Sequence, residues 1–505
     1  MRALLPMLFV PAIALAQPVV ETKPIKIYTE LGGYYGTNNQ TPFWMQANQF
    51  GTIPKSVPYA TFRVGAQMDH LYTPLAQTGQ KRKKDRFGWG YGVEAVVNSG
   101  PEGTEVIVPE AYVKGRLGAF EIMAGRRRDL IGLADSTVGM GSYAWSGNAL
   151  PVPKVQISLP DFTPLPFTKG LVAFRGLYSH GWFENQDRIV QNSFLHQKAL
   201  YGRVGKPGWR VKFYGGFNHQ VQWGGRSSRL PETLARNGRL PSTLRDYVDV
   251  VTGNSLGYRR DIDTTRISKM DRENRIGNHL GTIDLGVEFR ISNRFELLLY
   301  RQSIFEDGSL YYLINIKDGL QGIRLRNLRP LSSGFQIRDV VVEYMATLSQ
   351  GGGDFGDLPK QRGRDNYFNH SQYWDGWSYF TRTIGTPFIP NGRDTHPDLV
   401  RYSYTNNNRV QVMHLGVSGG FGLGGTFALR SSFSRNFGSW VAPFPDHTNQ
   451  FSAALNVGLP VSRRRGWLVT TTIATDQGKL YPNSTAVYAG VRKTWEYYKY
   501  RVRGK

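Results

Sequence analysis

Residues 282–290 read TIDLGVEFR and alternate strictly between apolar and polar or small side chains. In an extended strand the side chains at i and i+2 share a face. One face of this strand is therefore apolar, and the other carries Asp284, Glu288 and Arg290. The same alternation recurs at 61–68 and 467–474. Repeated strands of this kind indicate either a soluble β-sandwich or a barrel that spans a membrane.

Three features favour the membrane barrel. The alternating stretches run for roughly 9 to 13 residues, which matches a tilted span. Their polar faces carry Gly, Arg, Asp and Glu, which suit a hydrated lumen. Aromatic residues cluster at the expected strand ends: Tyr34-Tyr35, Phe87 with Trp89 and Tyr91, Tyr311-Tyr312, and Trp495 with Tyr497-Tyr498. We predict an all-β protein that forms a transmembrane antiparallel β-barrel. The sequence contains roughly 16 to 19 such stretches, and single-chain bacterial barrels have an even number of strands, so 16 or 18 strands are favoured.

The N-terminus predicts export. Residues 1–16 carry Arg2, an apolar core and the small-x-small pattern Ala14-Leu15-Ala16, which are typical of a cleaved signal peptide. The mature chain, 17–505, is expected to form a single barrel domain. No later run of 18 apolar residues suggests a transmembrane helix, and the absence of cysteine excludes disulfides, thiolate metal sites and an acylated N-terminal cysteine. We therefore expect the Gram-negative outer membrane as the location.

Two inserts interrupt the alternation. Near 231–251 the sequence predicts a helix that starts at Pro241-Ser242-Thr243-Leu244, with Leu244, Tyr247, Val248 and Val251 on one face. Near 351–398 lies a long aromatic insert rich in Gly and Asn. Barrels of this type pair short periplasmic turns with long outer loops. The helical insert could instead fold into a barrel end as a plug.

The net charge of +24 favours anionic partners. In an exported protein these are acidic polysaccharide and lipopolysaccharide phosphates, and nucleic acid is not expected. Outer-membrane lipid and the outer-membrane barrel assembly machinery are further expected partners. Neither a cofactor nor a metal is expected.

Ten short phrases carry a family resemblance. They are 30–35 (ELGGYY), 41–51 (TPFWMQANQFG), 125–127 (GRR), 132–136 (GLADS), 146–149 (SGNA), 196–198 (HQK), 219–225 (HQVQWGG), 365–370 (DNYFNH), 376–379 (GWSY) and 384–387 (IGTP). In this order they resemble the capsule assembly protein Wzi family over nearly the whole mature chain. The resemblance implies an 18-stranded outer-membrane barrel with helices closing its periplasmic end. It also implies a lectin-like role, in which capsular polysaccharide is held at the cell surface during capsule assembly. The family-motif residues singled out are Arg126, Arg127, Asp135, Asn148, His219 and Trp223.

The aromatic insert is the candidate polysaccharide site. Sugar rings present apolar C–H faces that stack on aromatic rings, and their hydroxyls need polar partners. An acidic sugar would also need arginine, which holds a carboxylate through two parallel hydrogen bonds. The alternative is that these aromatic side chains pack the insert against the barrel wall. The candidate residues are Tyr367, Tyr373, Trp374, Trp377, Tyr379, Arg364, Arg382, Asn366, Asn369 and His370.

Two other functions compete with polysaccharide binding. A channel for anionic solutes or oligosaccharides is the first, because arginines in the strand-like stretches should line the lumen. A lipid-modifying enzyme is the second, since three Asn-His pairs occur at 218–219, 278–279 and 369–370. The sequence has no HExxH motif and no Gly-x-Ser-x-Gly motif. We therefore expect no catalytic residues and a protein that is not an enzyme.

Overall fold

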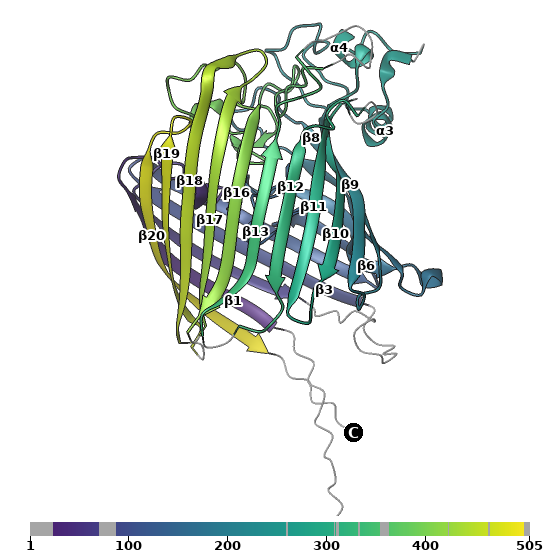
Figure 1. The fold of residues 1–505 in the computed structure, drawn as a ribbon. Helices are drawn as coiled ribbons and strands as arrows, with labels where there is room; N and C mark the ends of the chain where they lie inside the picture. The colour runs from purple at the N-terminus through teal and green to yellow at the C-terminus, as the bar shows by residue number, and fades with distance from the viewer. Residues whose placement is uncertain are drawn as a thin grey trace, which may run out of the picture.

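The protein is an 18-stranded β-barrel with long connections at one end (Figure 1). Its structure is a computed structural model, and the expected signal peptide lies outside the part that it describes. The described residues are 24–69, 87–258, 261–307, 309, 313–331, 334–353, 363–422, 424–462 and 465–498.

The barrel strands follow one another along the chain. Their bounds are β1 (Pro24–Gly36), β2 (Tyr59–Asp69), β3 (Phe87–Gly100), β4 (Gly103–Leu117), β5 (Phe120–Arg126), β6 (Lys154–Pro164), β7 (Val172–Trp182), β8 (Phe194–Val204), β9 (Val211–Trp223), β10 (Asn278–Arg290), β11 (Phe295–Glu306), β12 (Gly319–Asn327), β13 (Gln336–Ala346), β16 (Val410–Phe421), β17 (Gly425–Gly438), β18 (Pro443–Ser462), β19 (Trp467–Gly478) and β20 (Ser484–Tyr498). A separate hairpin, β14 (Ser378–Tyr379) and β15 (Arg382–Thr383), lies in the aromatic insert.

The sheet closes on itself without a free edge. Each barrel strand pairs antiparallel with the next, and the last strand, β20, pairs with β1 in a register that places Leu31 opposite Val491. Closure satisfies the backbone hydrogen bonds of every strand, which a membrane requires because lipid offers no partner for them. The predicted transmembrane antiparallel barrel is confirmed, and its strand number is the larger of the two expected.

The outward side chains are apolar and the inward ones polar. In β10, Leu285 is 60% exposed on the outer surface, whereas the neighbouring Asp284 points inward and is fully buried. In β2, Phe62 is exposed and Thr61 is buried. This is the reverse of a soluble protein, and it is the pattern that lipid around a barrel demands.

Aromatic side chains are exposed near both ends of the strands, as an interfacial girdle requires. The expected pair Tyr311-Tyr312 lies outside the described residues. The exposed members of the girdle are Tyr35, Phe87, Trp89, Trp495 and Tyr497.

The two ends of the barrel differ. β1 begins and β20 ends at the lower end in Figure 1, and the described connections there are short. Among the described connections, the long inserts lie at the opposite end. Bacterial barrels have short periplasmic turns and long outer loops, so the long inserts mark the outer end. These inserts are 37–58, 127–153, 183–193, 224–277, 307–318 and 347–409.

Short helices occur in the inserts and turns. Helix α3 starts where the sequence predicts it, since the Thr243 side chain accepts from the N–H of Asp246 and Asp246 caps Thr243 in return. Residues 231–243 form turns rather than helix. Both α3 and α4 lie at the outer end (Figure 1), not at the periplasmic end that the family resemblance implied. The helical segments are α1 (Phe43–Gln46), α3 (Leu244–Thr252) and α4 (Lys269–Glu273), with 3-10 turns η1 (Pro166–Thr168), η2 (Leu256–Tyr258) and η4 (Gly392–Asp394).

Within the described part of the chain, no helix has the length and apolar character needed to cross a membrane.

Two other inserts, 37–58 and 127–153, enter the lumen and plug it. The indole of Trp44 donates to Ser432 of β17 (2.9 Å), and the N–H of Leu133 donates to Asp284 of β10 (2.7 Å). The N–H of Met140 donates to Glu343 of β13 (2.5 Å). The main apolar core lies between these inserts and insert 347–409, and includes Trp44, Met140, Tyr143, Trp377 and Ile389. The lumen is therefore filled by loops that are pinned to several sides of the wall.

Candidate functional site

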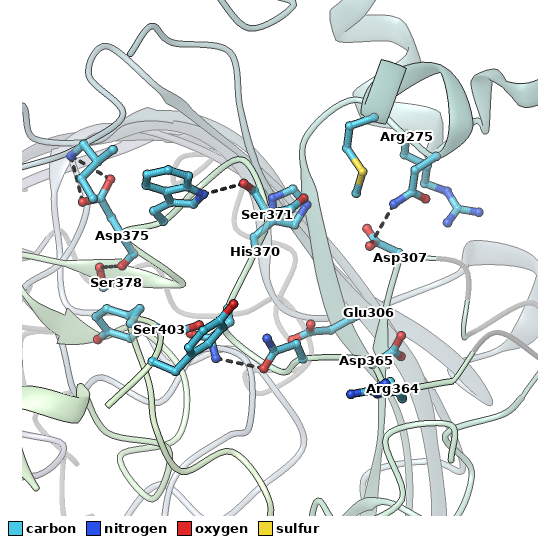
Figure 2. Close-up of a pocket in the computed structure, with 18 of the residues that line it drawn as sticks. Arg275, Glu306, Asp307, Arg364, Asp365, His370, Ser371, Asp375, Ser378 and Ser403 are labelled. Carbon is cyan, nitrogen blue, oxygen red and sulfur yellow. Dashed lines mark hydrogen bonds between the residues drawn. The ribbon is translucent and has the colours of Figure 1, made fainter. Parts of the chain in front are cut away.

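A large cavity opens above the plug at the outer end of the barrel. Its volume is about 1970 Å³, and four inserts contribute its walls: 183–193, 224–277, 307–318 and 347–409. Figure 2 shows Asp375 and Ser378 on one side of this space, Arg275, Asp307 and Arg364 on the other, and His370 and Ser403 between them.

Five of the ten predicted polysaccharide residues line this cavity: Arg364, Asn366, Asn369, His370 and Trp374. Trp374 keeps 42% of its surface exposed. Its indole N–H donates to the carbonyl of Ser371 at 2.7 Å, which fixes the ring in place. A fixed and exposed ring at a cavity wall is suited to stacking on a sugar.

Four predicted aromatic residues, Tyr367, Tyr373, Trp377 and Tyr379, do not reach the cavity. All are at most 2% exposed. Their polar atoms bind protein: the Trp377 indole donates to Ala144 O (3.0 Å), and the Tyr367 hydroxyl donates to Asp318 (2.9 Å). The prediction that these four rings stack on sugar is therefore wrong. They pack the insert onto the plug and the wall, which was the alternative interpretation.

Arg382 also holds the aromatic insert against another segment of the protein. Its guanidinium donates to the Gln46 side chain at 2.8 Å and to the carbonyl of Ile53 at 2.5 Å. Arg382 thereby ties hairpin β14–β15 to insert 37–58. It is not among the residues that line the large cavity.

The two predicted asparagines mainly hold loops together, although both border the cavity. The Asn369 amide donates to Asn366 (2.9 Å) and to the carbonyl of Thr405 (3.1 Å), and Asn369 accepts from the N–H of Thr405. The side-chain oxygen of Asn366 also accepts from Asn408 at 2.6 Å. This amide network connects residues 366–369 to residues 405–408, and so shapes the wall that carries Trp374.

The sequence interpretation missed three exposed residues of the cavity, namely Tyr402, Arg393 and Arg401. Tyr402 is 71% exposed and gives the cavity a second aromatic surface. Arg401 is positioned by donation from its Nε to the carbonyl of Gly392 (2.9 Å). Tyr402 lies four residues beyond the end assigned to the aromatic insert. The phrase Tyr402-Ser403-Tyr404, followed by Asn406-Asn407-Asn408, was the sequence signal that could have found it.

Charge within the cavity is distributed unequally between buried and exposed groups. Four lining arginines are solvent-exposed: Arg229, Arg364, Arg393 and Arg401. Several lining acids are instead engaged by protein; Asp375 accepts from the backbone N–H groups of Ile189 and Val190 (2.9 and 3.0 Å). Among the described residues, neither Arg364 nor Arg393 forms an ion pair. Two lining acids, Asp187 and Glu273, are exposed as well, so a ligand meets four exposed arginines and two exposed carboxylates.

Burial perturbs several titratable groups of the cavity, among them Asp365 and His370. It raises the pKa of the Asp365 carboxyl to about 7, although a hydrogen bond from the Asn315 amide (2.7 Å) opposes the shift. Burial lowers the pKa of His370, so this imidazole is neutral at pH 7. Asp365 follows Arg364 directly in the chain, and its charge state bears on how strongly this wall attracts an anion.

Backbone strain is concentrated in the same insert. Arg364, Phe368, Phe380 and Thr381 all have positive φ angles between 46° and 66°, which cost free energy in residues other than glycine. Phe380 and Thr381 form the two-residue turn between β14 and β15, where positive φ suits a tight hairpin. At Gly376 (φ +63°) a Cβ would come within 2.3 Å of the Tyr404 ring, so glycine is needed there.

The six family-motif residues all have structural contacts. The Arg126 guanidinium donates to the Tyr379 hydroxyl (2.9 Å) and so joins wall strand β5 to insert 347–409. Asn148 donates to the carbonyl of Thr383 (3.0 Å) and so joins the plug to the same insert. Asp135 accepts from the N–H groups of residues 137–139 and shapes a turn in the lumen. The remaining three make contacts outside insert 347–409. Arg127 pairs with Glu121 (2.7 Å). His219 contacts His279 (2.9 Å), and Trp223 packs against Phe194 and Tyr247.

Across the described residues, no group of three or more His, Cys, Asp or Glu side chains is arranged to hold a metal ion.

Comparison with known proteins agrees with the barrel architecture. The family model for capsule assembly protein Wzi matches residues 60–478. One similar solved structure is Wzi of Escherichia coli, an outer-membrane protein involved in group 1 capsule assembly and a carbohydrate-binding β-barrel. The two share 13% identity over 92% of this chain and 83% of that one, with a TM-score of 0.53. No curated protein sequence matches the chain.

Porins are more distantly similar. An anion-selective porin from Comamonas acidovorans shares 10% identity over 94% of this chain and 100% of that chain, with a TM-score of 0.37. OccAB4 of Acinetobacter baumannii shares 9% identity over 95% and 99% of the two chains, with a TM-score of 0.44.

The family model covers most of the sequence, from β2 to the end of β19. The closed barrel with its apolar outer surface is a protein of the Gram-negative outer membrane. The chain belongs to the capsule assembly protein Wzi family.

Proposed function

We propose that this protein binds an acidic capsular polysaccharide in the cavity at the outer end of its barrel, and so assists capsule assembly or attachment at the cell surface. The observation that carries the proposal is the pairing of exposed aromatic rings, Trp374 and Tyr402, with exposed arginines in one cavity. Membership of the Wzi family supports the same function. The proposed role is binding alone, with no bond made or broken.

Each part of the cavity has a task in this proposal. The rings of Trp374 and Tyr402 would stack on the C–H faces of sugar units. Arg364 and Arg393 would hold carboxylates of the glycan by charge-assisted hydrogen bonds. A repeating polymer can engage several cavities or several sites in one cavity, which multiplies weak affinities.

The plug favours binding over transport. Inserts 37–58 and 127–153 contact strands on several sides of the lumen, as the bonds of Trp44, Leu133 and Met140 illustrate. A long glycan held in the outer cavity would therefore remain outside. Lipid and lipopolysaccharide would surround the barrel, and the barrel assembly machinery would insert it.

The proposal is tested by glycan binding to the purified, refolded protein. Capsular material from a capsulated strain should bind, whereas the matching extract from an acapsular strain should not. Equal retention of both extracts would contradict the proposal. Single-channel recordings complete the test, because a large steady conductance would favour the channel function instead.

A further inference from the structure

Helix α3 packs on the outside of the barrel wall. The register of β7, β8, β9 and β10 places His180, His196, His219 and His279 on the outward face of these strands. Yet His196, His219 and His279 are at most 8% exposed, because insert 224–277 covers them. Figure 1 shows α3 beside the upper ends of β8 and β9.

Tyr247 of α3 contacts three of the barrel strands, and Val250 is fully buried beside it. The Tyr247 ring stacks on Trp223, with ring centres 5.1 Å apart, and meets His196 at 5.6 Å. The Tyr247 hydroxyl lies 2.9 Å from the hydroxyl of Tyr178 on β7. At the helix end, the Lys198 ammonium donates to the carbonyl of Val251. The helix therefore screens an outward patch of histidine and lysine.

Helix α3 carries apolar side chains on its exposed side as well as on its buried side, where Val250 packs against the wall. Leu244 is 82% exposed and Val248 is 54% exposed, and they lie one turn apart on the same face. Asp246 is buried instead, where it caps the helix and binds Arg266 at 2.5 and 3.0 Å. In water, exposure of the Leu244–Val248 face would be unfavourable.

The exposed face of α3 continues the apolar belt of the barrel. On the outward face of the same strands, Tyr178, Leu200 and Phe217 are exposed, and Trp182 is exposed at the end of β7. A polar patch on the lipid side of a barrel is costly, so a helix that covers it with leucine and valine extends the membrane-compatible surface upward. We propose that α3 is an interfacial helix whose Leu244–Val248 face lies in the outer leaflet of the outer membrane, among lipid acyl chains.

Charge argues for lipid rather than a second copy of the chain as the occupant. Insert 224–277 contains eleven Lys or Arg and seven Asp or Glu, a net charge of +4. Two such inserts brought face to face would repel, whereas lipid phosphates would attract them.

The absence of cysteine permits a direct test. Single Leu244→Cys and Val248→Cys variants, each spin-labelled and refolded into phosphatidylcholine liposomes, report collisions with oxygen and with a water-soluble nickel complex. Leu285→Cys on the outward face of β10 is the lipid control, and Val441→Cys in the outer connection between β17 and β18 is the water control. Both controls are exposed apolar positions, and retention of the heat-modifiable gel shift verifies folding of every variant.

The proposal expects the ratio of oxygen to nickel collisions at 244 and 248 to match the ratio at 285 and to exceed the ratio at 441. A ratio equal to that at 441 would place the helix in water and overturn the proposal. A second possible result is a low collision rate with both reagents, together with spin–spin broadening that disappears when the labelled protein is diluted with unlabelled protein. This result would mean that a second copy of the chain covers the helix, and it would also overturn the proposal.

Discussion

Arg128, in insert 127–153, donates hydrogen bonds of 2.5 and 3.1 Å to the two carboxylate oxygens of Glu94 in β3. Glu94 is 1% exposed and also pairs with Arg63 of β2 at 3.0 Å. One lumenal carboxylate thus joins the wall to the plug. The same Arg128 lies over the Phe50 ring, which connects the two lumenal inserts to each other.

Removing this arginine should loosen the plug. We expect Arg128→Ala to lower the free energy of unfolding by about 1–3 kcal/mol, because the buried Glu94 carboxylate loses one of its two arginine partners. Urea unfolding in detergent micelles, followed by tryptophan fluorescence, measures the change. Lys26→Ala is the matched control, since Lys26 and Glu496 form an exposed pair at 3.5 Å whose loss should cost below about 1 kcal/mol. Equal effects of the two variants would contradict the proposed importance of the Glu94 contact.

Trp374 and Tyr402 should contribute directly to glycan affinity. Each change to alanine removes about 1 kcal/mol of stacking, or roughly a fivefold rise in Kd. Isothermal titration with capsular polysaccharide measures the effect. Phe167→Ala is the control, since Phe167 is 83% exposed in η1 at the opposite end of the barrel. Unchanged affinity in both cavity variants would remove these rings from the site.

Trp377 should behave differently from Trp374, although only three positions separate them. Its side chain is fully buried and bonded to Ala144. Trp377→Ala should therefore lower the free energy of unfolding by about 3–5 kcal/mol. Trp374→Ala should leave stability almost unchanged. Thermal melts of the two variants in detergent distinguish the assignments, and equal melting temperatures would show that the packing role is misassigned.

Glycan binding should weaken with salt, because the exposed arginines of the cavity outnumber its exposed acids. We expect Arg364→Ala and Arg393→Ala to raise Kd at low ionic strength and to flatten its dependence on salt. Titrations at 50 and 500 mM NaCl measure both effects. Binding that is insensitive to salt in the unmodified protein would indicate that stacking alone provides the affinity.

The raised pKa of Asp365 predicts a pH dependence. Below about pH 7 this carboxyl is protonated in the folded protein, and above it the cavity gains a negative charge beside Arg364. Affinity for an acidic glycan should therefore fall between pH 6 and pH 8, and Asp365→Asn should abolish the fall. The same variant should also remove a loss of stability that develops as pH rises from about 4 to 7. A pH profile that Asp365→Asn does not alter would assign the effect to another group.

The two-residue alternation predicted the strands and their two faces, because each strand position obeys a local rule. Strand length, the polar faces and the aromatic residues at strand ends were needed to favour a barrel over a soluble sandwich. Asp284 and Leu285 must point to opposite faces whatever surrounds them, and lipid outside fixes which face is apolar. The start of α3 was predictable for the same reason, since the two residues that cap it, Thr243 and Asp246, lie only three positions apart in the sequence. The position of α3 was not predictable in this way, because it depends on Tyr247 meeting Trp223 and His196 on the outer wall.

The candidate site could be predicted only in part. The sequence alone determined that aromatic, amide and arginine side chains gather in one insert. Only the tertiary structure decided that Trp374 faces the cavity while Trp377 binds Ala144, which lies 233 residues earlier in the chain. The physical reason is that an irregular insert has no periodicity from which to read an inner and an outer face. Each of its side chains is buried or exposed according to which distant segment folds against it.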